Sequence, residues 1–468
     1  MGMMTLQRMA SRFTTWAERW FPDAFVFALV ALVLVCAAAV VNGAPLMRVS
    51  KAFGDGFWSL IPFTMQMVMV AVSGYVVAVS RPAAHVIESF AGLPRTGRGA
   101  VALVAALSML SSLLNWALSL IFSGLLVRAL ARRESLAMDY RAASAAAYLG
   151  LGATWAMGLS SSAAQLQANP ASLPPALLSV TGVIPFSQTL FLWQSLLLTA
   201  VLVVVSVIIA YGSAPGAESA RTAQALGIDV TEPQTVDAPP ARPGEWLEYS
   251  PLLTLLVVAL GLGWLWQEFG QKDPLTAISG LNTYNFLFLI VGMALHGRPR
   301  RFVEAVTRAV PTTGGVLIQY PFFAGLAGVL TGAAALDGST VSTAVAHGFV
   351  TIANADTFPL LMGAYSAVLG LFIPSGGGKW LIEAPYVMQA AVDLKVHLGW
   401  AVQVYNAAEA LPNLVNPFWM LPLLGVVGLK ARDIVGFTAL QLLIHVPVVL
   451  GLLALLATTL TYIPPQIP

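Results

Sequence analysis

The chain has 468 residues, of which 58% are hydrophobic and only 9% are charged. Soluble domains carry roughly 25% charged residues. The composition therefore excludes a soluble globular protein and predicts an all-α polytopic protein whose main partner is the lipid bilayer. The net charge of +2 gives no indication of a nucleic acid partner.

Apolar runs bounded by charged residues, proline or glycine predict about nine full membrane spans. They lie near 23–43, 57–80, 142–166, 183–211, 250–268, 281–297, 311–333, 400–428 and 434–460. A short interfacial helix is expected over 82–92. Residues 212–248 are polar and rich in proline and acidic residues, so we expect a cytoplasmic linker between a first half, 1–211, and a second half, 249–468.

Two stretches are too long or too broken for one simple crossing. Residues 99–133 carry Asn115-Trp116 at their centre, and residues 344–396 carry three consecutive glycines. Each glycine costs about 1 kcal/mol relative to alanine in a helix, so the triplet is expected to break the helix. Because broken backbone at membrane depth survives only where protein or a water-filled cavity covers it, we expect two re-entrant helical hairpins.

The basic residues predict the orientation. With the N-terminus in the cytoplasm and each hairpin returning to its own side, 18 of the 23 basic residues become cytoplasmic. Arg48, Lys51, Lys272 and Lys395 face outward, and Lys379 lies inside the second hairpin. This bias follows the positive-inside rule. It also supports the hairpins, because an odd number of crossings would move the later basic loops to the other side.

The two halves share a pattern of elements. A span containing Gln66 or Gln319 precedes each hairpin, and a span interrupted by polar residues follows it. The first half starts inside the cell and the second starts outside, so the repeats are expected to be inverted. Matched broken segments in two inverted halves point to a midplane site in a secondary transporter.

Several segments resemble a known family, the short-chain fatty acid uptake permeases of bacteria, which include acetoacetate and butyrate carriers. They are "WFPDAFVFA", "FGDGFWSLIPFTMQM", "LLNWALSLIFSGLLVR", "LIQYPFFAG", "ANADTFPLL", "IPSGGGKWLIEAP" and "NPFWMLPLLGVVGLKARDI". The resemblance covers nearly the whole chain and implies inverted repeats, two re-entrant hairpins, a homodimer in the bacterial inner membrane and uptake of small monocarboxylates.

A carboxylate needs hydrogen-bond donors and positive potential, which half-helix N-termini and exposed backbone N–H groups supply. We expect the substrate between the two hairpin tips. The candidate residues at the tips and interrupted spans are Asn115, Ser119, Ser160, Ser161, Ser162, Ser375, Gly376, Gly377, Gly378, Asn413 and Asn416. The alternative is that the glycines only allow tight helix packing.

The charged and amide side chains leave further alternatives open. Lys379 is expected to pair with the substrate carboxylate, to snorkel to the aqueous vestibule, or to pair with Glu383 one turn further on. Glu409 is the candidate for ion coupling, with a structural hydrogen bond as its alternative. Gln66 and Gln319 are expected to line the cavity or to join helices.

The sequence contains no HExxH, GxSxG or P-loop motif, so we expect neither an enzyme nor an ATP-driven pump. No cofactor or metal is expected, and the coupling ion is left as H⁺ or Na⁺. The predicted function is cation-coupled symport of short-chain fatty acids by alternating access. The alternatives are a carrier for another small carboxylate, such as a dicarboxylate, and a passive channel.

Overall fold

The computed structural model describes residues 19, 24–170, 173–231, 242–373, 375–416 and 419–467. Over these ranges the chain forms helices and loops, with one isolated bridge between Gly182 and Gln466. The predicted all-α fold class is therefore confirmed. The N-terminal segment with Arg8 and Arg12, on which part of the orientation argument depends, lies outside the described residues.

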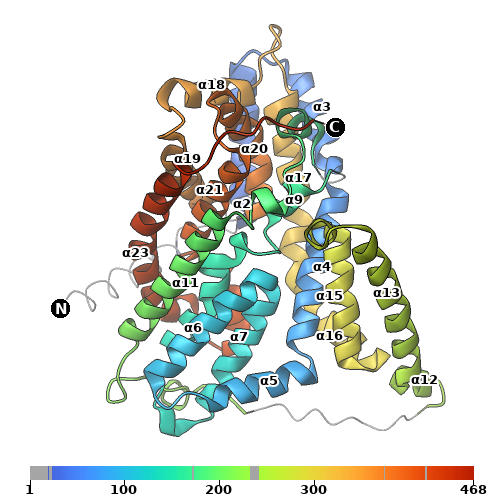
Figure 1. Cartoon of the computed structure of the whole chain (residues 1–468), viewed down its shortest axis with the longest axis vertical. Coiled ribbons are helices and arrows are strands. Elements are labelled where there is room, and N and C mark those ends of the chain that lie inside the picture. Colours follow the sequence, from blue (N-terminus) through green and yellow to red (C-terminus); the bar gives the residue numbers. More distant parts are fainter. Residues whose placement is uncertain are drawn as a thin grey trace.

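The first half contains ten α-helices in its described residues (Figure 1). They are α2 (Ala24–Val41), α3 (Leu46–Ser59), α4 (Ile61–Ala78), α5 (Arg81–Gly92), α6 (Gly97–Leu114), α7 (Trp116–Ala131), α8 (Tyr140–Leu149), α9 (Ser162–Ala168), α10 (Pro175–Thr181) and α11 (Trp193–Ser213).

The second half follows the linker. Its helices are α12 (Glu245–Tyr249), α13 (Pro251–Gln271), α14 (Pro274–Ser279), α15 (Leu281–His296), α16 (Pro299–Ala309), α17 (Gly314–Gly332), α18 (Val341–Ile352), α19 (Phe358–Phe372), α20 (Gly376–Asp393), α21 (Leu398–Asn413), α22 (Leu421–Val427) and α23 (Ala431–Ala457).

Six helices of the described ranges are long and apolar enough to cross a membrane, namely α4, α6, α11, α13, α17 and α23. Five of them fall on predicted spans, and α6 is the first arm of the predicted hairpin over 99–133. Helices α2 and α15 also stand where spans were predicted. The short helix expected over 82–92 is α5.

Some predicted boundaries are wrong. The span near 57–80 starts only at Ile61, because a separate helix, α3, ends at Ser59 and Pro62 begins a new first turn. The span near 183–211 starts only at Trp193, after a 3₁₀ turn. The span near 142–166 is not one helix: α8 passes into a π turn and a 3₁₀ turn before α9.

The two halves repeat one set of helix contacts. Helix α4 packs against α7 as α17 packs against α20, and α6 packs against α8 as α19 packs against α21. Likewise, α5 packs against α7 as α18 packs against α20. Helix α11 packs against α6 as α23 packs against α19. Figure 1 shows α5, α6 and α7 toward the lower end and α18, α19 and α20 toward the upper end. This arrangement agrees with two hairpins that enter from opposite sides.

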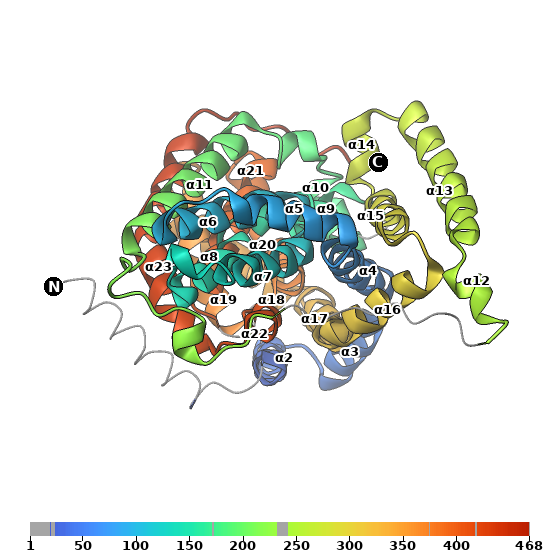
Figure 2. The same cartoon turned by 90° about the horizontal axis from the view of Figure 1, so that it is seen from below.

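Helices near the start of each half pack against the other half. Helices α2 and α3 pack against α17, whereas α15 and α16 pack against α4. Figure 2 shows α13 at the edge of the molecule, beyond α15. Only 22% of its most apolar window is buried inside the protein, so the hydrophobic side chains of α13 are suited to contact lipid.

The contact between α3 and α17 depends on small residues. Gly56 on α3 lies against Gly325 and Gly328 on α17, and a Cβ atom added to Gly328 would come within 2.5 Å of the Ala52 carbonyl oxygen. Small residues allow two helix backbones to approach closely in lipid, where the hydrophobic effect does not drive helix association. This packing fixes α2–α3 on the second half.

We predict that Gly328→Ala destabilises the protein by about 1–3 kcal/mol, because the added methyl group overpacks the α3–α17 contact. Thermal unfolding of the purified protein in detergent would measure the loss as a lower midpoint. Gly348→Ala is the matched control, since nothing lies within 4 Å of a Cβ atom at that helical position. Equal midpoints for the two variants would contradict the close packing.

Candidate functional site

The tip of the first hairpin is closed by side chains. Asn115 breaks the helix between α6 and α7, and its Oδ1 accepts hydrogen bonds from the N–H groups of Ala117 and Leu118 at 2.9 and 3.0 Å. Its Nδ2 donates to the Val70 carbonyl oxygen at 3.1 Å and to the Tyr284 hydroxyl at 3.0 Å. The Asn115 amide is therefore fully used within the protein, and it shapes the tip.

The serine run connects the broken span to both tips. Ser160 Oγ accepts from the Trp116 N–H at 3.0 Å, so the first three N–H groups of α7 are all bonded. Ser161 caps α9 and donates to Asn406 Oδ1 on α21 at 3.1 Å. Ser162 contacts Met67 Sδ at 3.5 Å and lies beside the Tyr320 hydroxyl. These contacts join α4, α7, α9, α17 and α21 around one point.

The second hairpin breaks just before the glycine triplet, which differs from the prediction. Gly376, Gly377 and Gly378 form the first turn of α20, and Ser375 is its N-cap, accepting from the Gly378 N–H at 3.2 Å. Glycine is tolerated in this turn because the first N–H groups of a helix have no partner within the helix and depend on the cap.

Each glycine of the triplet lies against an aromatic ring. Added Cβ atoms would come within 2.3 Å of the Trp155 ring, 2.9 Å of the Tyr320 hydroxyl and 2.2 Å of the Phe323 ring, respectively. Tight packing, the alternative stated for the glycines, is thus realised. It does not exclude binding, because the same contacts place two of these aromatic side chains, Trp155 and Tyr320, in the wall of a cavity.

A narrow cavity lies between the two hairpin tips. It is lined by residues of both hairpins, both interrupted spans and the two preceding spans: Met67, Trp116, Leu151, Trp155, Ser162, Val316, Tyr320, Gly376, Asn413 and Trp419. The centre of a water-sized sphere can move through about 20 Å³, which is enough for a water molecule. The conformation described here is therefore closed around the site.

Two buried groups in the cavity wall lack a hydrogen-bond partner. Asn413 has neither its Nδ2 nor its Oδ1 bonded, and Trp155 Nε1 is also unbonded. Buried polar groups are nearly always satisfied in folded proteins, so such groups indicate a ligand or a water molecule. The remaining wall is mostly aromatic and aliphatic, with Trp116 and Trp419 in edge contact at 5.8 Å.

Lys379 lies one turn behind the cavity and is completely buried, with a side-chain exposure of 0%. Its Nζ is 2.6 Å from Glu409 Oε2, 3.2 Å from Glu383 Oε1 and 2.8 Å from both the carbonyl and the hydroxyl oxygen of Ser366. The expectation that Lys379 snorkels to water is wrong for this conformation. Pairing with Glu383 is observed, and four protein oxygens surround the ammonium group.

Tyr405 connects this charged group to the cavity. Its hydroxyl donates to the Gly376 carbonyl oxygen at 2.5 Å, and its ring centroid lies 4.6 Å from Lys379 Nζ. Glu409 and Asn413 are four residues apart on α21, so they lie one turn apart on the same face. The charged group and the cavity therefore occupy consecutive turns of α20 and α21.

Other predicted residues lie outside the cavity wall. Ser119 is buried further down the first hairpin and donates to the Ser108 carbonyl oxygen at 2.7 Å. Gln66 donates to Asn282 Oδ1 at 2.7 Å, so it joins α4 to α15, one of its two expected roles. Gln319 is buried beside Tyr320, and Asn416 follows the end of α21.

The aromatic lining could not be predicted from the sequence. Aromatic residues are abundant in membrane proteins, and the spacing of Trp155, Tyr320 and Trp419 carries no signal. The glycine triplet was the available clue, since a close backbone approach requires a bulky neighbour. Among the described residues, no group of three His, Cys, Asp or Glu side chains is placed to hold a metal ion.

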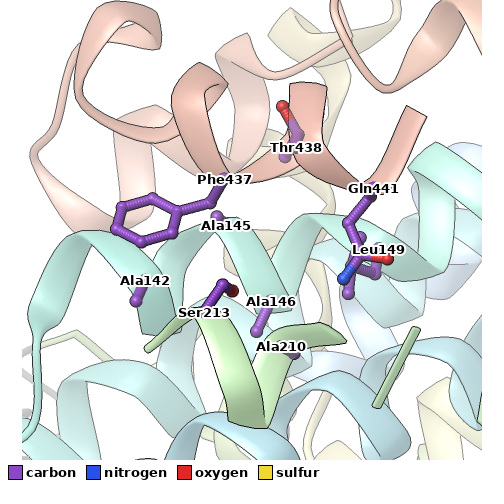
Figure 3. Close-up of a pocket in the computed structure, with 9 residues that line it drawn as sticks. All are labelled: Ala142, Ala145, Ala146, Leu149, Ala210, Ser213, Phe437, Thr438 and Gln441. Atoms are coloured by element: carbon purple, nitrogen blue, oxygen red, sulfur yellow. The ribbon is translucent and has the colours of Figure 1, made fainter. Parts of the chain in front are cut away.

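A second gap lies between α8, α11 and α23 (Figure 3). Alanines and the side chains of Leu149, Ser213, Phe437, Thr438 and Gln441 line it, and the free space for a water-sized sphere is about 10 Å³. Gln441 Nε2 bonds the Ser206 carbonyl oxygen at 3.0 Å. This gap is a packing defect between helices and offers no room for a substrate.

Comparison with known proteins gives consistent matches. The family model described as "Short chain fatty acid transporter" matches residues 5–456. A protein of Escherichia coli K12, provisionally assigned as a short-chain fatty acid transporter, is 34% identical over 440 residues, covering 92% of this chain and 96% of the relative. A Haemophilus influenzae protein with the same assignment is 32% identical over 457 residues, covering 96% and 99%.

Two solved structures share the fold. The YdaH transporter of Alcanivorax borkumensis, described as having an unusual topology, aligns with a TM-score of 0.57 at 18% identity, covering 94% of this chain and 98% of its own. MtrF of Neisseria gonorrhoeae, from a class of antimetabolite efflux pumps, aligns with a TM-score of 0.57 at 13% identity, covering 98% and 100%.

We predict that Asn115→Ala costs more stability than an ordinary capping loss. Removal of a cap costs about 1 kcal/mol, and the variant also leaves the buried groups around the tip unsatisfied, at about 1–3 kcal/mol. Thr96→Ala, at the outer end of the same hairpin, is the matched control, because Thr96 only caps α6. Thermal unfolding midpoints would compare them, and an equal loss would contradict the tip geometry.

Proposed function

Because the chain belongs to the short chain fatty acid transporter family, we propose that it carries small monocarboxylates, such as butyrate and acetoacetate, across the bacterial inner membrane. It is a multi-pass membrane transporter. We also propose that its N-terminus lies in the cytoplasm and that the protein couples substrate uptake to the entry of a cation.

The observation that carries this substrate class is the closed cavity between the hairpin tips. A short-chain fatty acid has one carboxylate and a small apolar chain. The unbonded Asn413 Nδ2 and Trp155 Nε1 offer two donors for the carboxylate, and the first turn of α20 adds a positive helix end. The rings of Trp116 and Trp419 and the side chains of Met67, Leu151 and Val316 offer an apolar wall.

The charge of the cavity favours one carboxylate over two. None of the described residues that line it is charged, and the nearby Lys379 is occupied by Glu383, Glu409 and Ser366. A dicarboxylate would need a second positive group, because a desolvated anion without a partner is costly. Neutral donors and one helix end suit a monoanion.

Transport requires the tips to separate. The free space in the cavity admits a water molecule and not a fatty acid. Each tip is attached to its own hairpin and interrupted span. We propose that movement of one hairpin opens the cavity to each side of the membrane in turn. Glu409, one turn from Asn413, is the proposed coupling residue, since its position links the cation to the cavity.

The proposal is tested by uptake of radiolabelled butyrate and acetoacetate into proteoliposomes under separate proton and sodium gradients. We expect accumulation above the external concentration under one gradient. Protein-free liposomes under the same gradients correct for passive entry of the protonated acids, and succinate tests the dicarboxylate alternative. Equilibration without accumulation would favour a channel, and transport of succinate alone would overturn the substrate class.

We predict that Asn413→Ala raises the KM for butyrate about tenfold, equivalent to about 1.4 kcal/mol, because one hydrogen bond to the carboxylate is lost. Initial uptake rates over a range of butyrate concentrations would measure it. Gln224→Ala, which removes an exposed amide in the linker, is the control and should leave KM unchanged. An unchanged KM in Asn413→Ala would remove Asn413 from the substrate site.

A further inference from the structure

The buried charged group behind the cavity has an unequal number of acids and bases. Glu383 and Glu409 surround Lys379, and all three side chains are at most 1% exposed. With every group ionised, this triad carries one net negative charge. A buried charge without a partner is strongly unfavourable in a protein interior. One additional positive charge would make the triad neutral.

The triad also has oxygen atoms free to accept that charge. Glu383 Oε2 and Glu409 Oε1 are buried and have no hydrogen-bond partner. The other oxygen of each carboxylate contacts Lys379 Nζ, at 3.2 Å for Glu383 and 2.6 Å for Glu409. The ammonium group thus fills the space between the carboxylates, and each carboxylate keeps one unused oxygen.

We infer that Glu383 and Glu409 share the binding of one coupling proton per transport cycle, and that Lys379 is their resident countercation, not a ligand of the substrate. The inference rests on the proposed function. A hydronium ion passes a proton to one free carboxylate oxygen, so an O–H bond of hydronium breaks, an O–H bond forms on the carboxyl group and a water molecule is left. The triad is then neutral. On the other side the carboxyl O–H bond breaks and the proton returns to a water molecule. A sodium ion would need more oxygen ligands than the two unused carboxylate oxygens.

Within the part of the chain that the structure describes, the other titratable side chains facing the triad are tyrosines. The ring of Tyr405 faces Lys379 from α21, and Tyr320 from α17 lies near Glu409. The hydroxyls of Tyr365 on α19 and Tyr386 on α20 are bonded to each other at 2.8 Å, near Glu383. Phenols are neutral at neutral pH, and Ser366 is not titratable, so the two carboxylates are the acceptors.

The triad can act on the substrate cavity through two connections. Lys379 and Gly376 are three residues apart in α20, and Glu409 and Asn413 are four residues apart in α21. Protonation weakens the attraction between Glu409 and Lys379, which attaches the second hairpin to α21. The hairpin is then less tightly held, so proton binding and opening of the cavity depend on each other.

The first experiment compares Glu383→Gln and Glu409→Gln with the native protein in proteoliposomes. Each variant leaves one carboxylate and one ammonium group, which are neutral without a proton. We expect both to lose accumulation of butyrate driven by a pH gradient, while exchange of labelled for unlabelled butyrate continues. Glu304→Gln, on the surface helix α16, is the matched control. Proton-driven accumulation in Glu383→Gln would overturn the shared site.

The second experiment restores the charge of the triad. Lys379→Met alone leaves two carboxylates without a countercation, and we expect loss of uptake. The double variant Lys379→Met with Glu383→Gln again has one net negative charge, so we expect proton-driven accumulation to return with the native KM for butyrate. A substrate countercation could not be replaced in this way, so a folded double variant with a much higher KM would overturn the role given to Lys379.

The outcomes separate this inference from the proposed function. If the native protein neither exchanges nor accumulates butyrate or acetoacetate, the proposed function fails. If the native protein accumulates them under a sodium gradient alone, the proton is overturned as the coupling ion. If both glutamine variants are folded and keep proton coupling, only the inference fails. Size-exclusion profiles in detergent establish whether each variant is folded. If the double variant does not fold, the two glutamine variants alone test whether the carboxylates bind the coupling proton.

Discussion

The structure depends on one constraint. Where a helix breaks, its backbone N–H and C=O groups lose their partners, and lipid cannot form hydrogen bonds with them. Both hairpins break in the middle of the protein, and both tips are capped by side chains. At the first tip, Asn115 and Ser160 bond the first three N–H groups of α7. At the second, Ser375 caps the glycine turn of α20. The caps come partly from neighbouring elements, so a hairpin can be stable only in the assembled protein.

The same constraint brings the two halves together. Ser160 and Ser161 belong to the first half, yet Ser161 bonds Asn406 of the second half. Asn115 bonds Tyr284, which also lies in the second half. The cavity consequently has walls from both repeats, and its closure depends on contacts between them. Relative movement of the two hairpins would change the wall on both sides, which is the property that alternating access requires.

Three charged side chains are buried together in this apolar protein. Lys379, Glu383 and Glu409 are buried next to the cavity and bonded to one another. Buried ion pairs contribute little net stability, because desolvation offsets their attraction. Their presence in a membrane protein is better explained by function than by folding. These side chains lie one helical turn from Asn413 and Gly376, so the charged group is directly connected to the cavity wall.

The membrane class, the positions of most spans and the helix break at Asn115 could be predicted from the sequence alone. Hydropathy predicts the spans, and the cap formed by Asn115 predicts the break at the first tip. The glycine triplet indicated the second tip only approximately, because the three glycines form the first turn of α20. Amphipathic helices such as α3 and α16 were missed, because their moderate hydropathy does not distinguish them from loops.

The contacts of each side chain depend on how separate helices pack. This packing placed Trp155 and Tyr320 against the glycines, turned Gln66 toward α15 and enclosed Lys379 between two glutamates. Glu409 is 30 residues beyond Lys379 in the chain, and no local pattern joins them. Partners of this kind depend on how separate helices pack, since residues far apart in the sequence meet only when the whole chain is folded.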